Sequence, residues 1–331
     1  MLRRSRLDRR RFISGTAAAT ALTIAAPRLS LAQAYPSRPV RVIIPFTPGG
    51  APDVLLRLVA QKLSEKWGQG VVIENRAGGN TLTGTVAATK SAPDGYTLLM
   101  TADQTFILNP LLYATLPYSM KELDPIILMA SIPHMLAVSH KVPASNVKEL
   151  IALAKQKPDT MTYGTTGPGT IQRIATEYFA GIAGIKLVHV PYRGANETTT
   201  AILSGEIDIT INGMSNILPH IEGGKVKALA ISTLTRHRLA PNIPTMQEAG
   251  VAGYSSQGAF GLFAPAGVPA DIRAKIHADT AEILKRPDVV KALEDRSFQV
   301  DNVGPDGFAK MIAAETEKWA KVIRAANIKG D

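Results

Sequence analysis

The sequence has no cysteine among its 331 residues. This absence excludes disulfides, thiolate zinc sites, iron–sulfur clusters and cysteine nucleophiles. It leaves the cellular compartment open, because a large domain needs no disulfide in an oxidising space. Long hydrophobic runs are missing as well, since no stretch approaches the ~18 consecutive apolar residues of a membrane-spanning helix. We therefore expect the mature chain to be soluble.

Motifs for nucleotides, metals and hydrolytic catalysis are also missing. The chain contains no G-x-x-x-x-G-K-[ST], no G-x-G-x-x-G that opens a helix and no G-x-S-x-G. Its six histidines show no H-E-x-x-H or other paired metal spacing. The sequence therefore predicts no cofactor, no metal and no catalytic residue, although a constellation assembled from distant loops stays open.

The composition is that of a globular protein of two domains, or three small ones. Apolar residues make up 45% and the mean hydropathy is +0.06, which argues against a disordered chain. The net charge of +10 suggests a polyanion partner. However, residues 1–34 hold seven arginines and one aspartate, so six of the ten charges lie there. The remaining +4 is too mild to argue for nucleic acid.

Residues 1–34 have the organisation of a secretory signal. An arginine-rich start is followed by a mild apolar run at residues 13–26, which is too short to span a bilayer comfortably. The small-residue pattern Ala32-Gln33-Ala34 then predicts cleavage after Ala34 and export to the periplasm. The segment Asp8-Arg9-Arg10-Arg11-Phe12-Ile13 indicates the twin-arginine route. An arginine-rich Sec signal is the alternative.

Strands and helices alternate along the mature chain, which is typical of a parallel α/β sheet. The pattern runs to about residue 100 and restarts near residue 136. Strands are predicted at 40–45, 71–73, 96–100, 136–138, 161–163, 187–190, 207–211, 228–231 and 258–263, and helices at 52–67, 85–90, 146–156, 171–183 and 196–203. Asn146 is a plausible N-cap for one of these helices.

After Pro269 the pattern is helical throughout, at about 270–285, 287–296 and 305–326. Such a block predicts a return of the chain to cover one face of the first sheet. The crossings would then lie near Ser131-Ile132-Pro133 and Tyr254-Ser255-Ser256. We expect one lobe from 35–132 with 256–331 and a second from 133–255. Two consecutive domains are the alternative that periodicity leaves open.

Three glycine-rich or small-residue loops each follow a strand and precede a helix, at residues 47–53, 75–81 and 164–170. In an open α/β sheet such loops lie at the carboxyl ends of strands, where ligands bind. Free backbone N–H groups at the helix starts favour a carboxylate or phosphate. These loops are therefore the candidate binding elements.

Three side chains near such loops have two interpretations each. Asp53, in a first helical turn, either compensates the helix dipole or accepts hydrogen bonds from a ligand. Arg193 either forms a bidentate hydrogen bond with a carboxylate or is a solvated charge between the domains. Tyr192 either contacts the ligand or packs at a strand end.

Several segments occur in the order and spacing of one known family. They are Tyr35-Pro36-Ser37-Arg38-Pro39-Val40, Pro45-Phe46-Thr47-Pro48-Gly49-Gly50, Val72-Ile73-Glu74-Asn75-Arg76, Pro93-Asp94-Gly95-Tyr96-Thr97-Leu98, Asn109-Pro110, the stretch 189–194, Pro244-Thr245, Glu248-Ala249-Gly250, Ala264-Pro265-Ala266-Gly267 and Glu317-Lys318-Trp319. The set resembles the Bug family, the periplasmic binding proteins of tripartite tricarboxylate transporters. The resemblance covers essentially the whole mature chain.

The resemblance implies a type II-like Venus flytrap, in which two α/β lobes joined by two crossing segments hold a small carboxylate between them. It implies a monomer without cofactor whose partners are the membrane subunits of a tripartite tricarboxylate transporter. Carried over to this sequence, it implies ligand-binding roles for Phe46, Thr47, Gly49, Gly50, Ala51, Asp53, Gly79, Asn80, Leu82, Thr83, Thr165, Thr166, Gly169, Thr170, Arg173, Tyr192, Arg193, Ala195, Asn212 and Met214.

Four positions depart from the family pattern. Ala77 stands in place of proline, Leu82 in place of a small polar residue, Arg173 in place of histidine and Ala201 in place of aspartate. If these positions contact the ligand, they predict a ligand with an apolar or aromatic body that can carry a second anionic group. Drift at positions away from the ligand is the alternative.

The sequence therefore predicts a non-catalytic periplasmic solute-binding protein. An exported enzyme acting on a small carboxylate is the alternative from a different class, and turnover of the ligand would distinguish it. A ligand-sensing adaptor is a third option, and it would bind a signalling partner instead of a transporter.

Overall fold

A computed structural model describes residues 35–329. The predicted signal segment at 1–34, with its twin-arginine motif and cleavage site, lies outside the described residues. The chain divides into two compact units, Met1–Ser37 and Arg38–Asp331. Everything below concerns the second unit, and within the described residues no helix is both long and apolar enough to cross a membrane.

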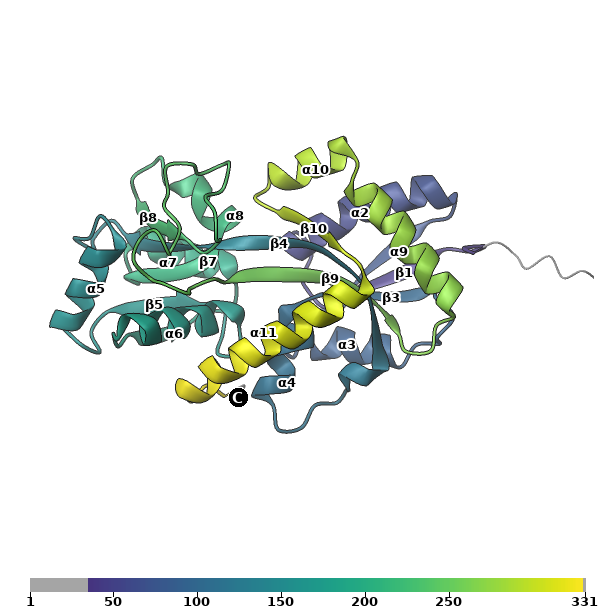
Figure 1. The fold of residues 1–331 in the computed structure, drawn as a ribbon, viewed down its shortest axis with the longest axis horizontal. Coiled ribbons are helices and arrows are strands. Elements are labelled where there is room, and N and C mark those ends of the chain that lie inside the picture. Colours follow the sequence, from purple (N-terminus) through teal and green to yellow (C-terminus); the bar gives the residue numbers. More distant parts are fainter. Residues whose placement is uncertain (1–34, 330–331) are drawn as a thin grey trace, which may run out of the picture. The chain divides into compact units, whose positions relative to one another are not determined.

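A mixed sheet of ten strands organises this unit, with the strand order β2-β1-β3-β9-β4-β7-β5-β6, while β10 and β8 also pair with β4 (Figure 1). We call β2, β1, β3, β9, β10 and residues 123–133 of β4 the first sheet region. We call β7, β5, β6, β8 and residues 134–139 of β4 the second sheet region. The strands are β1 Val40–Ile44, β2 Val71–Asn75, β3 Thr97–Ala102, β4 Leu123–Ser139, β5 Thr162–Thr165, β6 Val188–Pro191, β7 Ile209–Gly213, β8 Val226–Ile231, β9 Gln257–Pro265 and β10 Gln299–Val303.

Helices follow the strands as the sequence predicts, and their ends carry the expected signals. A proline near its start and a left-handed Gly68 at its end bound α2. Asn146 caps α5 by accepting the Glu149 N–H at 2.9 Å, so the predicted N-cap is confirmed. The α-helices are α2 Ala51–Trp67, α3 Leu82–Thr89, α4 Asn109–Leu112, α5 Val147–Gln156, α6 Ile171–Ala183, α7 Ala195–Ser204, α8 Met214–Ile217, α9 Ala270–Leu284, α10 Pro287–Glu294 and α11 Pro305–Ala325, with short π or 3₁₀ turns at Gln104–Leu108 (η1), Met120–Glu122 (η2) and Leu218–His220 (η3).

The 17-residue strand β4 joins the two sheet regions. It pairs with β9 as far as Pro133 and with β7 from His134 onward. The sequence predicts only residues 136–138 of this strand. Pro125 and Pro133 interrupt the strand pattern, and a proline is tolerated where a strand is irregular. The change of partner lies beside the predicted boundary at 132/133, and the lobe limits themselves stay a prediction.

Two predictions for the last third of the chain are wrong. The segment after Pro269 is not helical throughout, because β10 pairs with β4 across a bulge. Only five residues long and carrying Asp301 and Asn302, β10 lacks a strand-like composition. The final helices also do not cover a single face. Helices α9 and α10 pack beside α2, whereas α11 packs beside α4, and Figure 1 shows α10 above and α11 below the strands.

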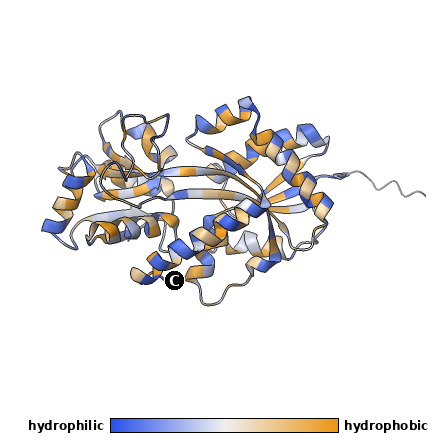
Figure 2. Ribbon diagram, viewed as in Figure 1, coloured by the Kyte–Doolittle hydropathy of each residue, from blue (hydrophilic) through white to orange (hydrophobic). Residues whose placement is uncertain are grey.

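Apolar clusters fill both sheet regions. In the first, Phe106, Phe263 and Phe308 pack with ring centroids 5.1–5.4 Å apart, next to the buried Trp319. In the second, Tyr163 packs among buried aliphatic side chains. Helices of both regions carry hydrophobic and hydrophilic residues in alternation in Figure 2, as amphipathic helices on a core do.

Candidate functional site

Strand direction brings the predicted loops of both regions to one junction. β1 and β3 are parallel to each other, β3 is antiparallel to β9, and β9 is antiparallel to β4. β1 and β3 therefore run in the same direction as β4, towards the second sheet region. β7 is antiparallel to β4, while β5 and β6 follow the direction of β7. The carboxyl ends of the two sets of strands consequently point towards each other.

The register along β4 sets the distance between these two edges. Ala102, at the end of β3, lies level with Ala130 of β4 through Phe260 of β9. Gly213, at the end of β7, lies opposite His134 of β4. Four residues of strand separate Ala130 from His134, which corresponds to about 13 Å. Loops that follow these strand ends therefore face each other across the junction.

In the first region, Asp53 holds the loop that precedes α2. Its carboxylate accepts hydrogen bonds from the Gly49 N–H at 2.9 Å, from Arg57 Nε at 2.8 Å and from Asn75 Nδ2 at 2.9 Å. Burial raises the pKa of Asp53, but these hydrogen bonds outweigh it and hold the pKa below its usual value. Asp53 is only 1% exposed. Its oxygens are thus engaged by the protein, which favours a role in shaping the loop.

The first turn of α2 leaves backbone donors free. The first intrahelical hydrogen bond runs from the Val54 N–H to the Gly50 carbonyl at 3.0 Å. The N–H groups of Ala51 and Asp53 have no acceptor among residues 35–329, and Pro52 has no N–H. Two amides at the positive end of a 17-residue helix are therefore without a hydrogen-bond acceptor.

The second loop of this region has a strained backbone. Gly78, Gly79, Asn80 and Thr81 all have positive φ, at 131°, 54°, 55° and 74°. A threonine in the left-handed region is uncommon, and strain of this kind persists only where the surroundings impose it. Here α3 begins directly after the strained residues, at Leu82.

A buried polar network imposes this conformation. Asn80 Nδ2 donates to Asn109 Oδ1 at 2.8 Å, and Asn109 Nδ2 donates back to the Asn80 carbonyl at 2.8 Å. Thr105 Oγ1 donates to Thr81 Oγ1 at 2.8 Å, and the Tyr118 hydroxyl donates to the Thr105 carbonyl at 2.6 Å. The side-chain amide of Asn80 is therefore engaged by Asn109, and the loop reaches the junction already shaped.

The other predicted residues of this region differ in exposure. Leu82 packs over Gly79, where an added Cβ would lie 3.5 Å from the Leu82 Cβ. Thr47, Gly49, Gly50, Gly79 and Thr83 are exposed, and Phe46, Ala51, Asn80 and Leu82 are half-buried.

In the second region, Thr165 ties the loop between β5 and α6. Its hydroxyl lies 2.7 Å from His189 Nε2 and also contacts the Gly167 backbone, and Thr170 Oγ1 donates to the Gly167 carbonyl at 2.9 Å. Thr165, Gly169 and Thr170 are buried, and Thr166 is half-buried. The three residues that open α6 have N–H groups without an acceptor among residues 35–329.

Arg173 brings a positive charge to the start of α6. Its Nη1 donates to the Pro168 carbonyl at 3.3 Å, while its Nε is buried without a hydrogen-bond partner. Burial and the charge of Arg173 together lower the pKa of His189 to about 4. His189 is therefore neutral near pH 7, and Arg173 is the cation of this loop.

The predicted ligand contacts that follow β6 either form hydrogen bonds within their own region or are exposed. The Tyr192 hydroxyl donates to Glu206 Oε1 at 2.7 Å, and burial raises its pKa to about 12. The Arg193 guanidinium is exposed and has no ion pair among residues 35–329, and its backbone N–H donates to Glu197 Oε2 at 3.0 Å. Ala195 is half-buried at the first position of α7.

Asn212, at the end of β7, offers a buried donor. Its Oδ1 accepts the Gly213 N–H at 2.8 Å and Asn216 Nδ2 at 3.2 Å, which fixes the orientation of the amide. Its Nδ2 is buried without a partner. An unpaired buried donor costs about 1–3 kcal/mol. A ligand acceptor would relieve that cost.

Met214 and Ala201 lie in the hydrophobic core of the second region. Both are fully buried in an apolar cluster of the second region with Ile202 and Ile217. The side chain at position 201 is therefore core, and the absence of an aspartate there adds no exposed charge to the junction. Met214 likewise packs in this core, where it supports the end of β7.

Sequence reasoning missed the residues that hold the first-region loops. Asn75 and Asn109 hold these loops, and Asp103, which accepts hydrogen bonds from the backbone of Ala259 and Gln104, is a further buried residue at this edge. Asp103 follows β3 at the same edge, is 4% exposed, and has its pKa raised to about 7 by burial. The position of Asp103 directly after an apolar strand is a signal that could have found it. The pairing of Asn80 with Asn109 bridges 29 residues and has no local signal.

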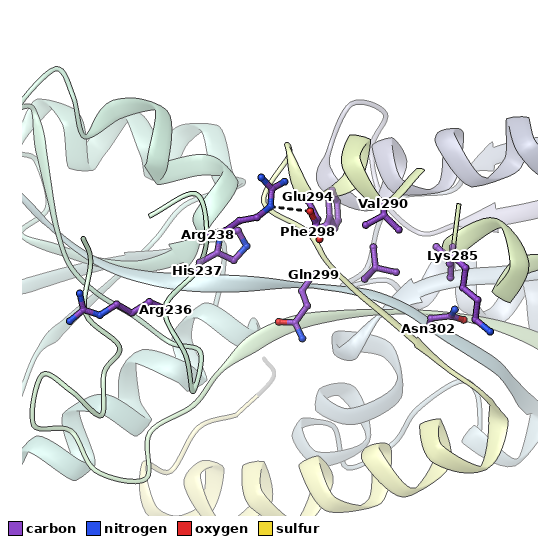
Figure 3. Close-up of a pocket in the computed structure, with 11 residues that line it drawn as sticks. Arg236, His237, Arg238, Lys285, Val290, Glu294, Phe298, Gln299 and Asn302 are labelled. Carbon is purple, nitrogen blue, oxygen red and sulfur yellow. Dashed lines mark ion pairs between the residues drawn. The ribbon is translucent and has the colours of Figure 1, made fainter. Parts of the chain in front are cut away.

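Two cavities lie away from these loops. One, of about 490 Å³, is lined by Arg236, His237 and Arg238 from the second region and by residues of α9, α10 and β10 (Figure 3). The other, of about 290 Å³, is lined by Asp103, Ser232 and Lys318 among others. Neither is lined by a residue of the predicted ligand site. Within residues 35–329, no three His, Cys, Asp or Glu side chains are arranged to hold a metal.

Fold and site together define a protein of the α/β class with helix starts and unpaired donors at the junction of its two sheet regions. The model of the tripartite tricarboxylate transporter family receptor matches residues 55–328. The chain therefore belongs to this family, as the resemblance predicts.

Known relatives align with nearly the whole chain. Protein BugT of Bordetella pertussis is 33% identical over 300 residues, 90% of this chain and 92% of the relative. A structure of an R. palustris protein with adipate is 31% identical, with a TM-score of 0.81 over 89% of this chain and 99% of that one. MatC from Rhodopseudomonas palustris with bound malate is 27% identical, with a TM-score of 0.77 over 87% and 100%. These likenesses confirm the predicted α/β periplasmic-binding-protein fold.

Proposed function

We propose that this chain is a periplasmic solute-binding protein that captures a small carboxylate at the junction of its two sheet regions and delivers it to a tripartite tricarboxylate-type transporter. Residues 1–34 would serve as the export signal. Residues 35–132 with 256–331 would form one lobe, and 133–255 the other. The family and its solved members are binding proteins, which supports a non-catalytic role.

The unpaired amide of Asn212 carries this proposal. It is a buried donor with a fixed orientation, and it lies at the strand edge that faces the first region. The amides of Ala51 and Asp53 supply further donors at a helix start across the junction. Several N–H donors without an acceptor suit an anion with several acceptor oxygens. A carboxylate fits this set, and the relatives solved with adipate and malate support that class.

The ligand body is proposed to be aliphatic, with a second carboxylate. Leu82 offers apolar surface beside the first-region loop. Arg173 supplies a cation whose Nε has no partner. The core position of Ala201 contributes nothing to this choice.

Binding would act by a population shift. A ligand that contacts both regions stabilises the arrangement in which the two edges are close, and the membrane partner recognises that arrangement.

A thermal-shift panel tests the proposal on refolded, ligand-stripped protein. Mono-, di- and aromatic carboxylates are compared at equal concentration, and a ligand at ~100 times its Kd should raise the stability by about 2.7 kcal/mol. The bound compound is then recovered and identified. Unchanged ligand supports binding, whereas a converted compound points to the enzyme alternative. Stabilisation by amino acids or sugars alone would overturn the carboxylate assignment.

A further inference from the structure

An ion-pair cluster connects the two sheet regions at the larger cavity. Arg238 lies in the loop at 232–240, which follows β8 of the second region, whereas Glu294 and Asp295 lie at the end of α10 in the first. Arg238 Nε is 2.9 Å from Glu294 Oε2, and its Nη2 is 3.3 Å from Asp295 Oδ1. Figure 3 shows the Arg238–Glu294 pair reaching from one region to the other.

Each partner is fixed to its own region. The Arg238 loop is held by Arg236, whose Nε donates to Glu248 at 2.9 Å and whose Nη1 donates to the Pro241 carbonyl at 3.1 Å. On the other side, Val289 and Leu293 bury the inner face of α10. The distance between Arg238 and Glu294 therefore follows the relative position of the two regions.

The space beside this cluster is not closed by apolar packing. The cavity of about 490 Å³ is lined by both regions at this place. By contrast, α6 and α11 meet through Ile174, Tyr178 and Trp319, with the Tyr178 and Trp319 rings 5.8 Å apart. Helices α10 and α11 cover opposite faces of the first region, so one face has a packed contact and the other an ionic one (Figure 1). A packed contact can serve as a pivot, and the ionic contact is then the one that opens.

We propose that Arg238, with Glu294 and Asp295, is an electrostatic latch that stabilises the present relative position of the two sheet regions and sets how much of the unliganded protein adopts it. This role goes beyond solute binding, because it needs no ligand. Two other groups lie near the latch: Lys291 lies 2.6 Å from Asp295, and His237, whose pKa is lowered by burial and by Arg238, is adjacent to Arg238.

The strength of such a latch is modest and depends on salt. Side chains of the cluster are 39–48% exposed, so water and ions screen them. Ion pairs of this exposure correspond to a change of about two- to fivefold in a two-state equilibrium. A change of that size is sufficient to alter the population of a binding protein without unfolding it.

The absence of cysteine makes a direct measurement simple. Spin labels are attached through Gln61→Cys on α2 and Lys148→Cys on α5, both exposed positions, and the label–label distance distribution is recorded on ligand-stripped protein. We expect Arg238→Gln to lower the population of the present separation about two- to fivefold relative to the other separations. High salt should have the same effect on the parent protein.

Two further variants make the result specific. Lys321→Gln removes an exposed ion pair with Glu317 that lies within α11, so it should leave the distribution unchanged. Arg238→Glu combined with Glu294→Arg restores an opposite-charge pair and should recover part of the original population. Identical distributions for Arg238→Gln and the parent overturn the latch, as does an equal shift with Lys321→Gln. Because no ligand is present, a wrong assignment of the ligand leaves this result unaffected.

Discussion

The two halves of the junction differ in how their polar groups are paired. In the first sheet region, the polar side chains of the loops are engaged with each other: Asp53 with Gly49, Arg57 and Asn75, and Asn80 with Asn109. In the second, Arg173 Nε and Asn212 Nδ2 are buried without partners. The first region therefore offers backbone amides on a rigid frame, and the second adds buried side-chain donors to the backbone amides that open α6.

This difference assigns separate roles to the two edges. A frame of satisfied side chains holds backbone donors in place at no further entropic cost when the ligand binds. Unsatisfied side-chain donors, in contrast, gain a partner only when a ligand arrives. We infer that the first edge recognises a carboxylate as such, while the second edge selects among carboxylates.

Asp53→Ala should have the largest effect, because it removes the acceptor of several hydrogen bonds at once. We expect the free energy of unfolding in urea to fall by about 3 kcal/mol. Affinity for every carboxylate should fall together, since the amides of Ala51 and Asp53 lose their support. Arg57→Gln is the matched control: its side chain is 54% exposed, so the loss should stay below about 1 kcal/mol. Parent-like unfolding of Asp53→Ala would show that the loop is held by other contacts.

Asn212→Asp replaces the unpaired donor by an acceptor of the same shape and leaves an oxygen for the Gly213 N–H. We expect the Kd for the carboxylate ligand to rise about 10- to 100-fold by calorimetry, because a hydrogen bond to a charged group is replaced by repulsion. Stability without ligand should also fall, because position 212 is fully buried and a carboxylate there loses its hydration. Asn216→Asp, four residues along, controls for the added charge and should affect affinity much less. Equal effects of the two variants would mean that charge alone, and not the Asn212 donor, is responsible.

Arg173→Gln tests selection among carboxylates. If Arg173 binds a second carboxylate, the affinity for a dicarboxylate should fall about 3- to 10-fold relative to the monocarboxylate of the same length, as expected for one half-exposed ion pair. Affinity for the monocarboxylate should stay close to that of the parent. Arg193→Gln, which removes an exposed cation at the end of β6, provides the comparison. An equal loss of affinity for both ligands would mean that Arg173 contributes to carboxylate binding in general and does not select among carboxylates.

Mild acid should lower the stability of the second-region edge but not that of the first-region edge, and this effect should be smaller. The pKa of His189 is lowered to about 4 by burial and Arg173, so below about pH 6.5 the unfolded chain binds this proton more readily. Stability linked to His189 is therefore lost as pH falls from about 6.5 towards 4. The pKa of Asp53 is instead below its usual value of 3.8, so the contribution of Asp53 persists until the pH falls below about 3.8.

Hydrogen exchange at pH 7 and pH 5, corrected for its intrinsic pH dependence, measures this difference. Residues 165–173 should lose protection at pH 5, while residues 46–53 keep it. His134, whose pKa is also lowered to about 4, lies at the partner change of β4 and affects both regions. His189→Gln therefore serves as the control and should abolish only the loss at 165–173. Equal loss at both loops in that variant would contradict a local origin.

Local patterns were sufficient for most elements. The periodicity of Leu55, Leu56, Val59 and Leu63 predicts α2, and the run Val40-Arg41-Val42-Ile43-Ile44 predicts β1, since both patterns depend on neighbours in sequence. They failed for β10 and for the first part of β4, where composition opposes the strand and long-range pairing overrides it. The position of the final helices on two faces of the first region is also a property of packing alone.

For the site, the sequence by itself determined which loops follow strands, the glycines that permit them and the ordered motifs of the family. Only the tertiary structure decided which side chains are engaged within the protein and which donors stay unpaired. Asn80 meets Asn109, and Arg238 meets Glu294, across separations that no local pattern encodes. The physical reason is that hydrogen bonding and burial depend on distance in space, whereas a sequence records only distance along the chain.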